Sequence, residues 1–184
     1  MTRGSRSARR VQLRTPEPAD EEAFLTAVAA SRGLHRPWVH PPSTPEAFQA
    51  AFVAGAGATR RVSYFAIERE SGTIAGVFNL SEIVRGPLQS AYLGFYAFAA
   101  SSGRGLMTDA LRLVTTRAFG ELRLHRVEAN VQPANGRSLA LVERCGFRRE
   151  GFSPRYLRIA GRWRDHERWA ILVEDWKAAR REQL

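Results

Sequence analysis

One apolar segment that runs through two glycines into a helical pattern constrains the fold of this chain more than any other feature. Residues 91–100 are mostly apolar and aromatic, as expected for a buried strand. A short turn with Gly103 and Gly105 follows. The next apolar residues keep the spacing of one helix face: Met107, Ala110, Leu111, Val114 and Ala118. A strand, a glycine turn and a helix in this order direct free main-chain N–H groups and the positive end of the helix at an anion.

The glycine turn therefore predicts a site for a pyrophosphate, and the alternative is an ordinary strand-to-helix turn. With 15 glycines in 184 residues, chance alone gives about one Gly-x-Gly, and residues 55–57 hold a second. A Rossmann-type loop is excluded because Thr108 stands where its last glycine would be. A P-loop is excluded because no Gly-Lys-Ser/Thr occurs.

Length and composition predict one globular domain. The chain has 184 residues, 44% of them hydrophobic, which is enough for a substantial core. No apolar run reaches the roughly 18 residues that a membrane span needs, so we expect no membrane partner. Cys145 is the only cysteine, and we expect a buried structural thiol in a reducing, cytoplasmic environment. The four histidines show no ligand spacing, so we expect no metal.

The charge balance points to acidic partners. The formal net charge is +10, which suits nucleotide phosphates, RNA or an acidic peptide. A general arginine bias is the alternative, since Lys177 is the only lysine among 28 basic residues. No RNA-binding motif occurs, so nucleic acid is not expected as the main ligand, and weak ribosome or RNA affinity stays open.

The hydrophobic periodicity predicts a mixed α/β fold. We expect a basic, disordered tail at residues 1–9 and one domain over 10–184. Strands are expected at 11–14, 61–69, 73–80, 90–99, 125–131, 147–159 and 163–172. Helices are expected at 21–31, 44–54, 135–145, after the glycine turn, and from 174. Asp20, Thr44 and Asn135 are the expected N-caps, and a Schellman closure with Gly146 at C′ and Phe147 at C″ is expected to end the helix at 135–145.

Two segments of this chain together resemble the GNAT superfamily of acyl-CoA-dependent N-acetyltransferases: LGFYAFAASSGRGLMTDALRL and LHRVEANVQPANGRSLALVERCGFRREG. Within it, the chain is most similar to the ribosomal-protein-alanine N-acetyltransferase (Rim) type, from about Val11 to Leu172. The resemblance implies a single α/β (α+β) acetyltransferase domain with a mixed, mostly antiparallel sheet and helices on both faces. It also implies that the two central strands splay apart, so that acetyl-CoA enters between residues 96–99 and 129–131.

The resemblance implies a set of cofactor-binding residues around the glycine turn. Main-chain amides of the turn would hold the pyrophosphate of coenzyme A: Ser102, Gly103, Arg104, Gly105 and Leu106. Ser102 departs from the Gln or Arg that the family often carries at that position. The rest of the cofactor set would be Phe98, Ala99, Met107, Asn130 and Asn135.

The resemblance also supplies two candidate catalytic residues. Acetyl transfer requires the amine to lose a proton, and Glu128 is the implied base, directly or through water. The alternative for Glu128 is a structural salt bridge to a neighbour such as Arg126 or Arg149. Ser138 is the implied proton donor to the leaving thiolate, because Val142 stands where many members carry a tyrosine.

The sequence defines the residues that would bind the acceptor amine less well than those for the cofactor. Trp38, His35 and Tyr96 are the implied substrate-binding residues, with a plain surface loop as the alternative for His35. The expected function is an acetyl-CoA-dependent N-acetyltransferase that acts by direct attack in a ternary complex. The acceptor would be a protein N-terminal amine. A small-molecule amine or antibiotic acetyltransferase, and a non-catalytic acyl-CoA-binding or ribosome-binding module, remain alternatives. A monomer and a homodimer are both compatible with the sequence.

Overall fold

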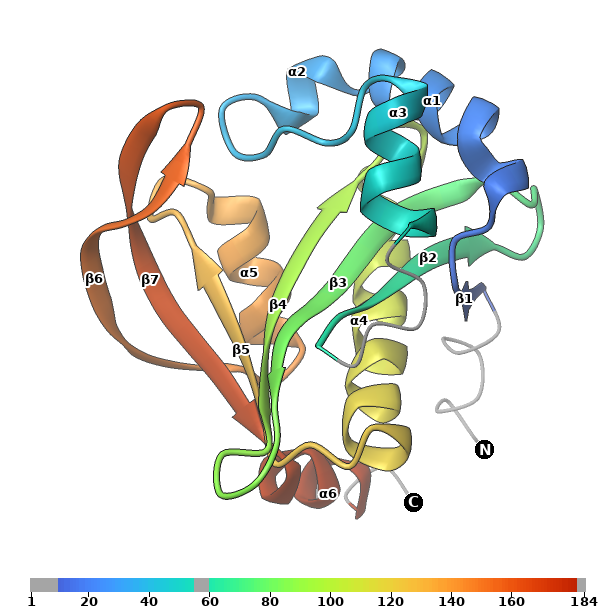
Figure 1. Ribbon diagram of the computed structural model, residues 1–184. Helices are drawn as coiled ribbons and strands as arrows, with labels where there is room; N and C mark the ends of the chain where they lie inside the picture. The colour runs from blue at the N-terminus through green and yellow to red at the C-terminus, as the bar shows by residue number, and fades with distance from the viewer. Residues whose placement is uncertain (1–9, 55–59, 182–184) are drawn as a thin grey trace.

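The computed structural model describes residues 10–54 and 60–181, and the tail expected at 1–9 lies outside this part. The strands are β1 (Val11–Arg14), β2 (Val62–Glu68), β3 (Ile74–Val84), β4 (Ser90–Ala97), β5 (Arg126–Val131), β6 (Arg148–Ile159) and β7 (Arg162–Leu172). The helices are α1 (Glu21–Ala30), α2 (Arg32–His35), α3 (Pro45–Phe48), α4 (Leu106–Thr116), α5 (Gly136–Arg144) and α6 (Val173–Arg181) (Figure 1). Short π-helical turns extend α3 and α4, over 49–53 and 117–121.

The seven strands form one sheet in the order β1-β2-β3-β4-β5-β7-β6. All neighbouring pairs are antiparallel except β4 and β5, which are parallel. This central pair is joined only from Ser90–Arg126 to Tyr92–Glu128, and the two strands then diverge (Figure 1). The structure confirms the expected mixed, mostly antiparallel sheet that splays at its centre.

Helices cover both faces of the sheet and divide the core in two. On one face, α4 and α5 bury residues such as Leu111, Val114 and Val142 against the strands. On the other face, Phe24 of α1 lies at the centre of an aromatic cluster. Its ring is between 5.2 and 5.7 Å from four other rings, those of Phe48, Phe52, Phe65 and Phe98. Burying such a ring fully contributes roughly 1.5–3 kcal/mol, so this cluster fixes the N-terminal helices to the sheet.

The helix ends test the capping predictions. The Thr44 hydroxyl accepts a hydrogen bond from the Ala47 amide at 3.2 Å, so the predicted cap is confirmed. Helix α5 ends in the expected Schellman closure, in which the Phe147 amide donates to the Val142 carbonyl at 3.1 Å and Gly146 has φ +88°. The prediction for Asp20 was wrong. It makes no side-chain cap for α1, because its carboxylate is bound by Arg14.

Candidate active site

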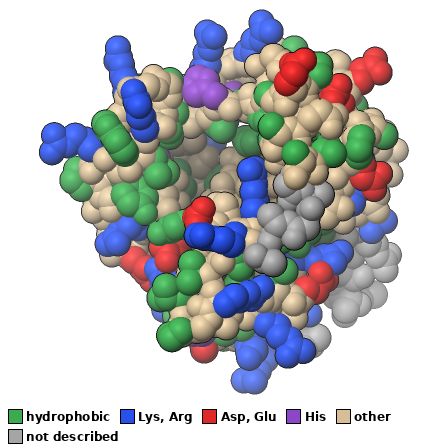
Figure 2. Space-filling view, in the orientation of Figure 1, with side chains coloured by type: hydrophobic (Ala, Val, Ile, Leu, Met, Phe, Trp, Pro, Cys, Tyr) green, Lys and Arg blue, Asp and Glu red, His purple; other side chains and the backbone are tan. Residues whose placement is uncertain are grey.

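The divergence of β4 and β5 opens a cavity of about 1120 Å³ at the centre of the molecule. Residues 93–97 of β4 line one side, and Asn130 and Val131 of β5 with the following Gln132 line the other. The glycine turn, α5, the α2 segment and the β6–β7 hairpin complete the wall. Figure 2 shows the corresponding hollow between the part of the molecule with β5–β7 and the part with α1–α3. Its lining residues come from several separate elements, among them His35 of α2 and Ser138 of α5.

The glycine turn forms one end of this cavity. Gly103 and Gly105 adopt left-handed conformations, with φ of +76° and +77°, as glycine readily does. The hydroxyl of Ser101 anchors the turn to β3 by donating to the Ala75 carbonyl at 2.5 Å. A side chain at position 103 would meet no described protein atom within 4 Å, so this glycine faces open space.

Five consecutive main-chain amides of the turn are unpaired in the described part of the chain. They belong to Gly103, Arg104, Gly105, Leu106 and Met107. The Ser102 amide, which the resemblance includes in the pyrophosphate site, is already paired, because it donates to the Ala99 carbonyl. Earlier in the chain, the Ala99 amide donates to the Ser31 hydroxyl. Five free amides at the start of α4, beside the helix dipole, fit an anionic group such as a pyrophosphate.

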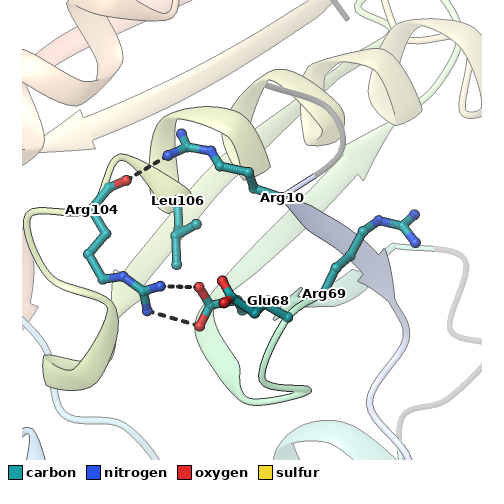
Figure 3. A pocket seen from close by; sticks show the side chains of 6 residues that line it. Arg10, Glu68, Arg69, Arg104 and Leu106 are labelled. Atoms are coloured by element: carbon teal, nitrogen blue, oxygen red, sulfur yellow. Dashed lines mark hydrogen bonds and ion pairs between the residues drawn. The ribbon is translucent and has the colours of Figure 1, made fainter. Parts of the chain in front are cut away.

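Two arginines hold the turn from behind (Figure 3). Arg104 binds the carboxylate of Glu68 with both of its terminal nitrogens, one of them at 2.9 Å. Arg10 donates to the Arg104 carbonyl at 3.0 Å and to the buried Asp109 carboxylate at 2.8 Å. Hydrogen bonds from Arg104 and Ser71 keep the pKa of Glu68 below its ordinary value. The side chain of Arg104 therefore faces away from the large cavity, and only its main chain lies at the predicted anion site.

The three expected substrate-binding residues come together in the cavity wall. Trp38, His35 and Tyr96 all line it. His35 is 4% exposed, which differs from the surface-loop alternative, and its Nε2–H donates to the Ala97 carbonyl at 2.9 Å. Burial lowers the pKa of His35, and the ring contacts Tyr96 edge to face at 5.4 Å between centroids. Burial also raises the pKa of the Tyr96 hydroxyl, so this hydroxyl stays protonated and can donate a hydrogen bond at neutral pH.

The cavity also brings together the polar residues expected on β5 and α5. Asn130, Asn135 and Ser138 line it. Asn135 caps α5, since its Oδ1 accepts from the Ser138 amide at 3.2 Å. The buried Oδ1 of Asn130 has no partner among the described residues. Unpaired polar groups in a cavity wall are available to a ligand that carries amide groups.

Glu128 lies apart from this group. It shares a face of β5 with Asn130, two positions before it, yet it does not line the cavity. Its carboxylate accepts a hydrogen bond from Arg126 at 2.9 Å, and Arg126 also binds Glu150. The salt bridge that was the alternative for Glu128 is therefore present. A role as base stays a prediction.

Three further expected cofactor residues have side chains outside the cavity. Phe98 belongs to the aromatic cluster and Leu106 to the core beneath α4, while Ala99 is exposed beside the turn. Cys145 does not line the cavity either. Burial raises the pKa of its thiol to about 11, which supports the expected structural role.

The cavity has lining residues that the sequence did not predict. They include Leu34, Gln132, Arg137, Leu157, Ile159 and His166. The apolar pair on β6 and His166 on β7 lie on the same side of the closing hairpin, a placement that depends on the register of its bulged strands. In the described part of the chain, no group of three or more His, Cys, Asp or Glu residues could hold a metal ion. No described helix is long and apolar enough to cross a membrane.

A splayed mixed sheet with a glycine turn at its cleft defines an acyl-CoA-dependent transferase. Residues 10–148 match the Acetyltransferase (GNAT) domain family, so the chain belongs to this family of N-acetyltransferases. Acetyl-CoA is the acyl donor of the family.

The chain is similar to named relatives over less than two thirds of their own length. The Probable N-acetyltransferase YjcK of Bacillus subtilis is 44% identical over 102 residues, which is 55% of this chain and 56% of that protein. The [Ribosomal protein uS5]-alanine N-acetyltransferase of Escherichia coli is 38% identical over 118 residues, 64% of this chain and 61% of that protein. A solved structure of Mycobacterium smegmatis RimJ in complex with CoA-disulfide superimposes with a TM-score of 0.83 at 28% identity, covering 95% of this chain and 91% of that one.

Proposed function

We propose that this chain acetylates the α-amino group at the N-terminus of a protein, by direct attack of the amine in a ternary complex with acetyl-CoA. One observation carries the proposal: a single cavity joins the glycine turn, in which five main-chain amides are unpaired, to a buried region around His35 and Tyr96. The relative that acts on the alanine of ribosomal protein uS5, and the structural similarity to RimJ, support a protein acceptor.

The donor side of the cavity suits acetyl-CoA. In our proposal the amides of residues 103–107 bind the pyrophosphate, while Ser102 and Met107 line the same end. Asn130 and Asn135 then hydrogen-bond the amide groups of the pantetheine arm. Bound acetyl-CoA supplies an activated thioester, and the residues around it hold that group against the incoming amine.

The proposed chemistry needs one proton to leave the amine and one donor for the leaving thiolate. An α-amino group has a pKa near ~8, so a modest base is enough. We assign that base to Glu128 acting through water, because its carboxylate is bound to Arg126 and lies outside the cavity wall. Ser138 lines the cavity and is the proposed donor to the thiolate.

The cavity suits an acceptor with a single amine better than a polycation. No Asp or Glu occurs among the described residues that line it, whereas Arg137 and Arg144 do. Burial lowers the pKa of both cavity histidines, His35 and His166. A polyamine would therefore bring several charges into a cavity that offers no carboxylate to pair with them.

The test is a comparison of acceptors with thiol release from acetyl-CoA as readout. N-terminal peptides of ribosomal proteins, spermidine and an aminoglycoside are incubated with the purified chain, and the product is located by mass spectrometry. We expect acetylation of the peptide α-amine. Transfer to spermidine or the aminoglycoside alone would contradict the protein acceptor, and tight coenzyme binding without turnover would indicate a non-catalytic module.

The direct route has its own test at Cys145. The Cys145→Ala variant should keep its kcat, because the thiol lies outside the cavity and burial keeps it protonated. An acetylated enzyme that forms on Cys145 in the absence of acceptor would replace direct attack with a ping-pong mechanism.

A further inference from the structure

Three buried polar side-chain atoms lack a hydrogen-bond partner in the described part of the chain: Tyr96 Oη, Asn130 Oδ1 and Arg164 Nε. Tyr96 and Asn130 line the cavity. Arg164 lies on β7 directly opposite Leu157, which also lines the cavity. A buried polar atom without a hydrogen-bond partner destabilises the folded state, so such a group in a folded protein calls for an explanation.

The register of the β6–β7 hairpin places a second arginine on the same face. Arg162 is directly opposite Ile159, a cavity-lining residue, and directly opposite residues share one face of a sheet. Side chains alternate along a strand, so His166, two positions after Arg164 on β7, lies on the same face, and it also lines the cavity. Arg162 and Arg164 therefore belong to the cavity face of the hairpin. Neither forms an ion pair with a described carboxylate.

The surroundings of the two arginines are basic. The described lining residues include no carboxylate. On the other side of the cavity, the exposed Arg32 and Arg36 flank the lining residues Gly33 to His35. Figure 2 shows Lys and Arg side chains on both sides of the hollow. The mouth that receives the acceptor thus has a positive field, which attracts and orients anionic ligands.

We infer that Arg162 and Arg164 form a subsite for a carboxylate of the acceptor, so that the preferred acceptor is a peptide with Asp or Glu a few residues after its N-terminal amine. The inference rests on the proposed protein acceptor and specifies its sequence. An arginine fork binds a carboxylate with charge-assisted hydrogen bonds. A carboxylate bound there supplies the acceptor that Arg164 Nε lacks.

A peptide carboxylate fits this subsite better than the backbone of RNA. Arg164 is half-buried next to the cavity-lining Leu157, and its Nε is enclosed. A flexible acidic side chain can reach such a position, whereas a phosphate backbone is bound by exposed rows of basic residues. Trp163, the most exposed aromatic residue of the hairpin at 61%, pairs with Arg158 and so lies on the opposite face from the cavity.

The experiment measures kcat and KM for peptides of equal length that all begin with alanine. One series carries a single Glu at each of positions two to five, a second carries Lys there, and a third carries Ser. We expect the best Glu peptide to have a KM roughly tenfold below that of the Ser peptide, with similar kcat, because only the Glu side chain forms a charge-assisted hydrogen bond with the arginines. The advantage should shrink at high salt.

Variants assign the effect to the hairpin. Arg162→Glu should remove the preference for Glu and improve the Lys peptides, and it leaves the buried Arg164 intact. Arg164→Lys keeps the charge but loses Nε, so it should lose part of the preference while transfer to the Ser peptide continues. Arg123→Glu is the matched control for charge, because Arg123 is exposed just before the end of β5 that pairs with β4 and does not line the cavity.

The outcomes separate this inference from the proposed function. Equal KM for Glu, Ser and Lys peptides, unchanged by Arg162→Glu, would overturn the subsite while peptide acetylation stands. Failure to acetylate any peptide, with transfer to a small amine, would overturn the proposed function instead. Competition by a single-stranded RNA oligonucleotide that Arg162→Glu abolishes, without any peptide preference, would assign the arginines to nucleic acid and reject the subsite.

Discussion

Arg10 and Asp109 form an ion pair directly behind the glycine turn, with 2.5 Å between Arg10 Nη2 and Asp109 Oδ2. The Asp109 side chain is 3% exposed, and the same guanidinium reaches the Arg104 carbonyl. Arg10, which precedes β1, therefore fixes the main chain of the glycine turn, which carries the unpaired amides.

We predict that Asp109→Asn weakens acetyl-CoA binding about 3- to 10-fold with little change in kcat, because the loosened Arg10 no longer fixes the turn. Calorimetric titration with acetyl-CoA is the measurement. Asp20→Asn is the matched control. Asp20 is also buried, and its carboxylate is paired with Arg14 of β1, away from the glycine turn. If both variants lose stability and neither changes the affinity, the Arg10–Asp109 pair serves only the fold.

Gly103→Val should weaken acetyl-CoA binding more than tenfold, because its side chain would enter the space that we assign to the pyrophosphate. Gly161→Val is the control, as Gly161 has the same φ of +76° and also faces open space, at the β6–β7 turn. Both variants should lose roughly 1–3 kcal/mol of unfolding free energy from backbone strain. An equal change of affinity in both would argue against the cofactor site.

Glu128→Gln should lower kcat by roughly 10²-fold and leave the acetyl-CoA Kd within a few-fold, because it removes the proposed base but keeps the shape. Its rate should rise with pH towards the pKa of the acceptor amine. Glu150→Gln removes the other carboxylate bound to Arg126 and is the matched control. Full activity of a stable Glu128→Gln variant at neutral pH would exclude the base, and equal effects of the two variants would indicate an ion-pair role.

Stability should fall as the pH drops below about 6.5. Burial lowers the pKa of His35 and His166 below the ordinary histidine value of about 6.5. As the pH falls, the unfolded chain therefore takes up protons first, and the folded state loses stability until the pH has passed the pKa of the folded state. Each ring contributes a slope of at most about 1.4 kcal/mol per pH unit, before solvent screening reduces it. Urea unfolding of the His35→Gln/His166→Gln double variant should show a flatter dependence between pH 6.5 and 5. The exposed His40→Gln serves as control, and an unchanged slope in the double variant would refute the assignment.

The local signals in the sequence predicted the elements around the site. The glycine turn between β4 and α4, the Thr44 and Asn135 caps and the closure at Gly146 are short-range features, so a few neighbouring residues determine them. The divergence of β4 and β5 was expected only from the family resemblance, because it depends on how strands that are distant in the sequence pair.

The sequence could not predict contacts between distant segments. Asp is a residue type that commonly caps helices, but the carboxylate of Asp20 is bound by Arg14 instead. Arg104 belongs to the glycine turn, yet the hydrogen bond to Glu68 on β2 directs the Arg104 side chain away from the cavity. The cavity face of the β6–β7 hairpin depends on two register shifts in β6, which its residue pattern does not reveal.

The short β4–β5 ladder, from Ser90–Arg126 to Tyr92–Glu128, makes the molecule two half-sheets attached at one end. One half carries Tyr96, and the other carries the hairpin with Leu157 and Ile159. In our proposal a coenzyme is seated between them and acts as a spacer, so that its presence sets the width of the opposite opening. Donor binding should therefore precede acceptor binding in an obligatory order, and slowed amide exchange at the ends of β4 and β5 would report the first step.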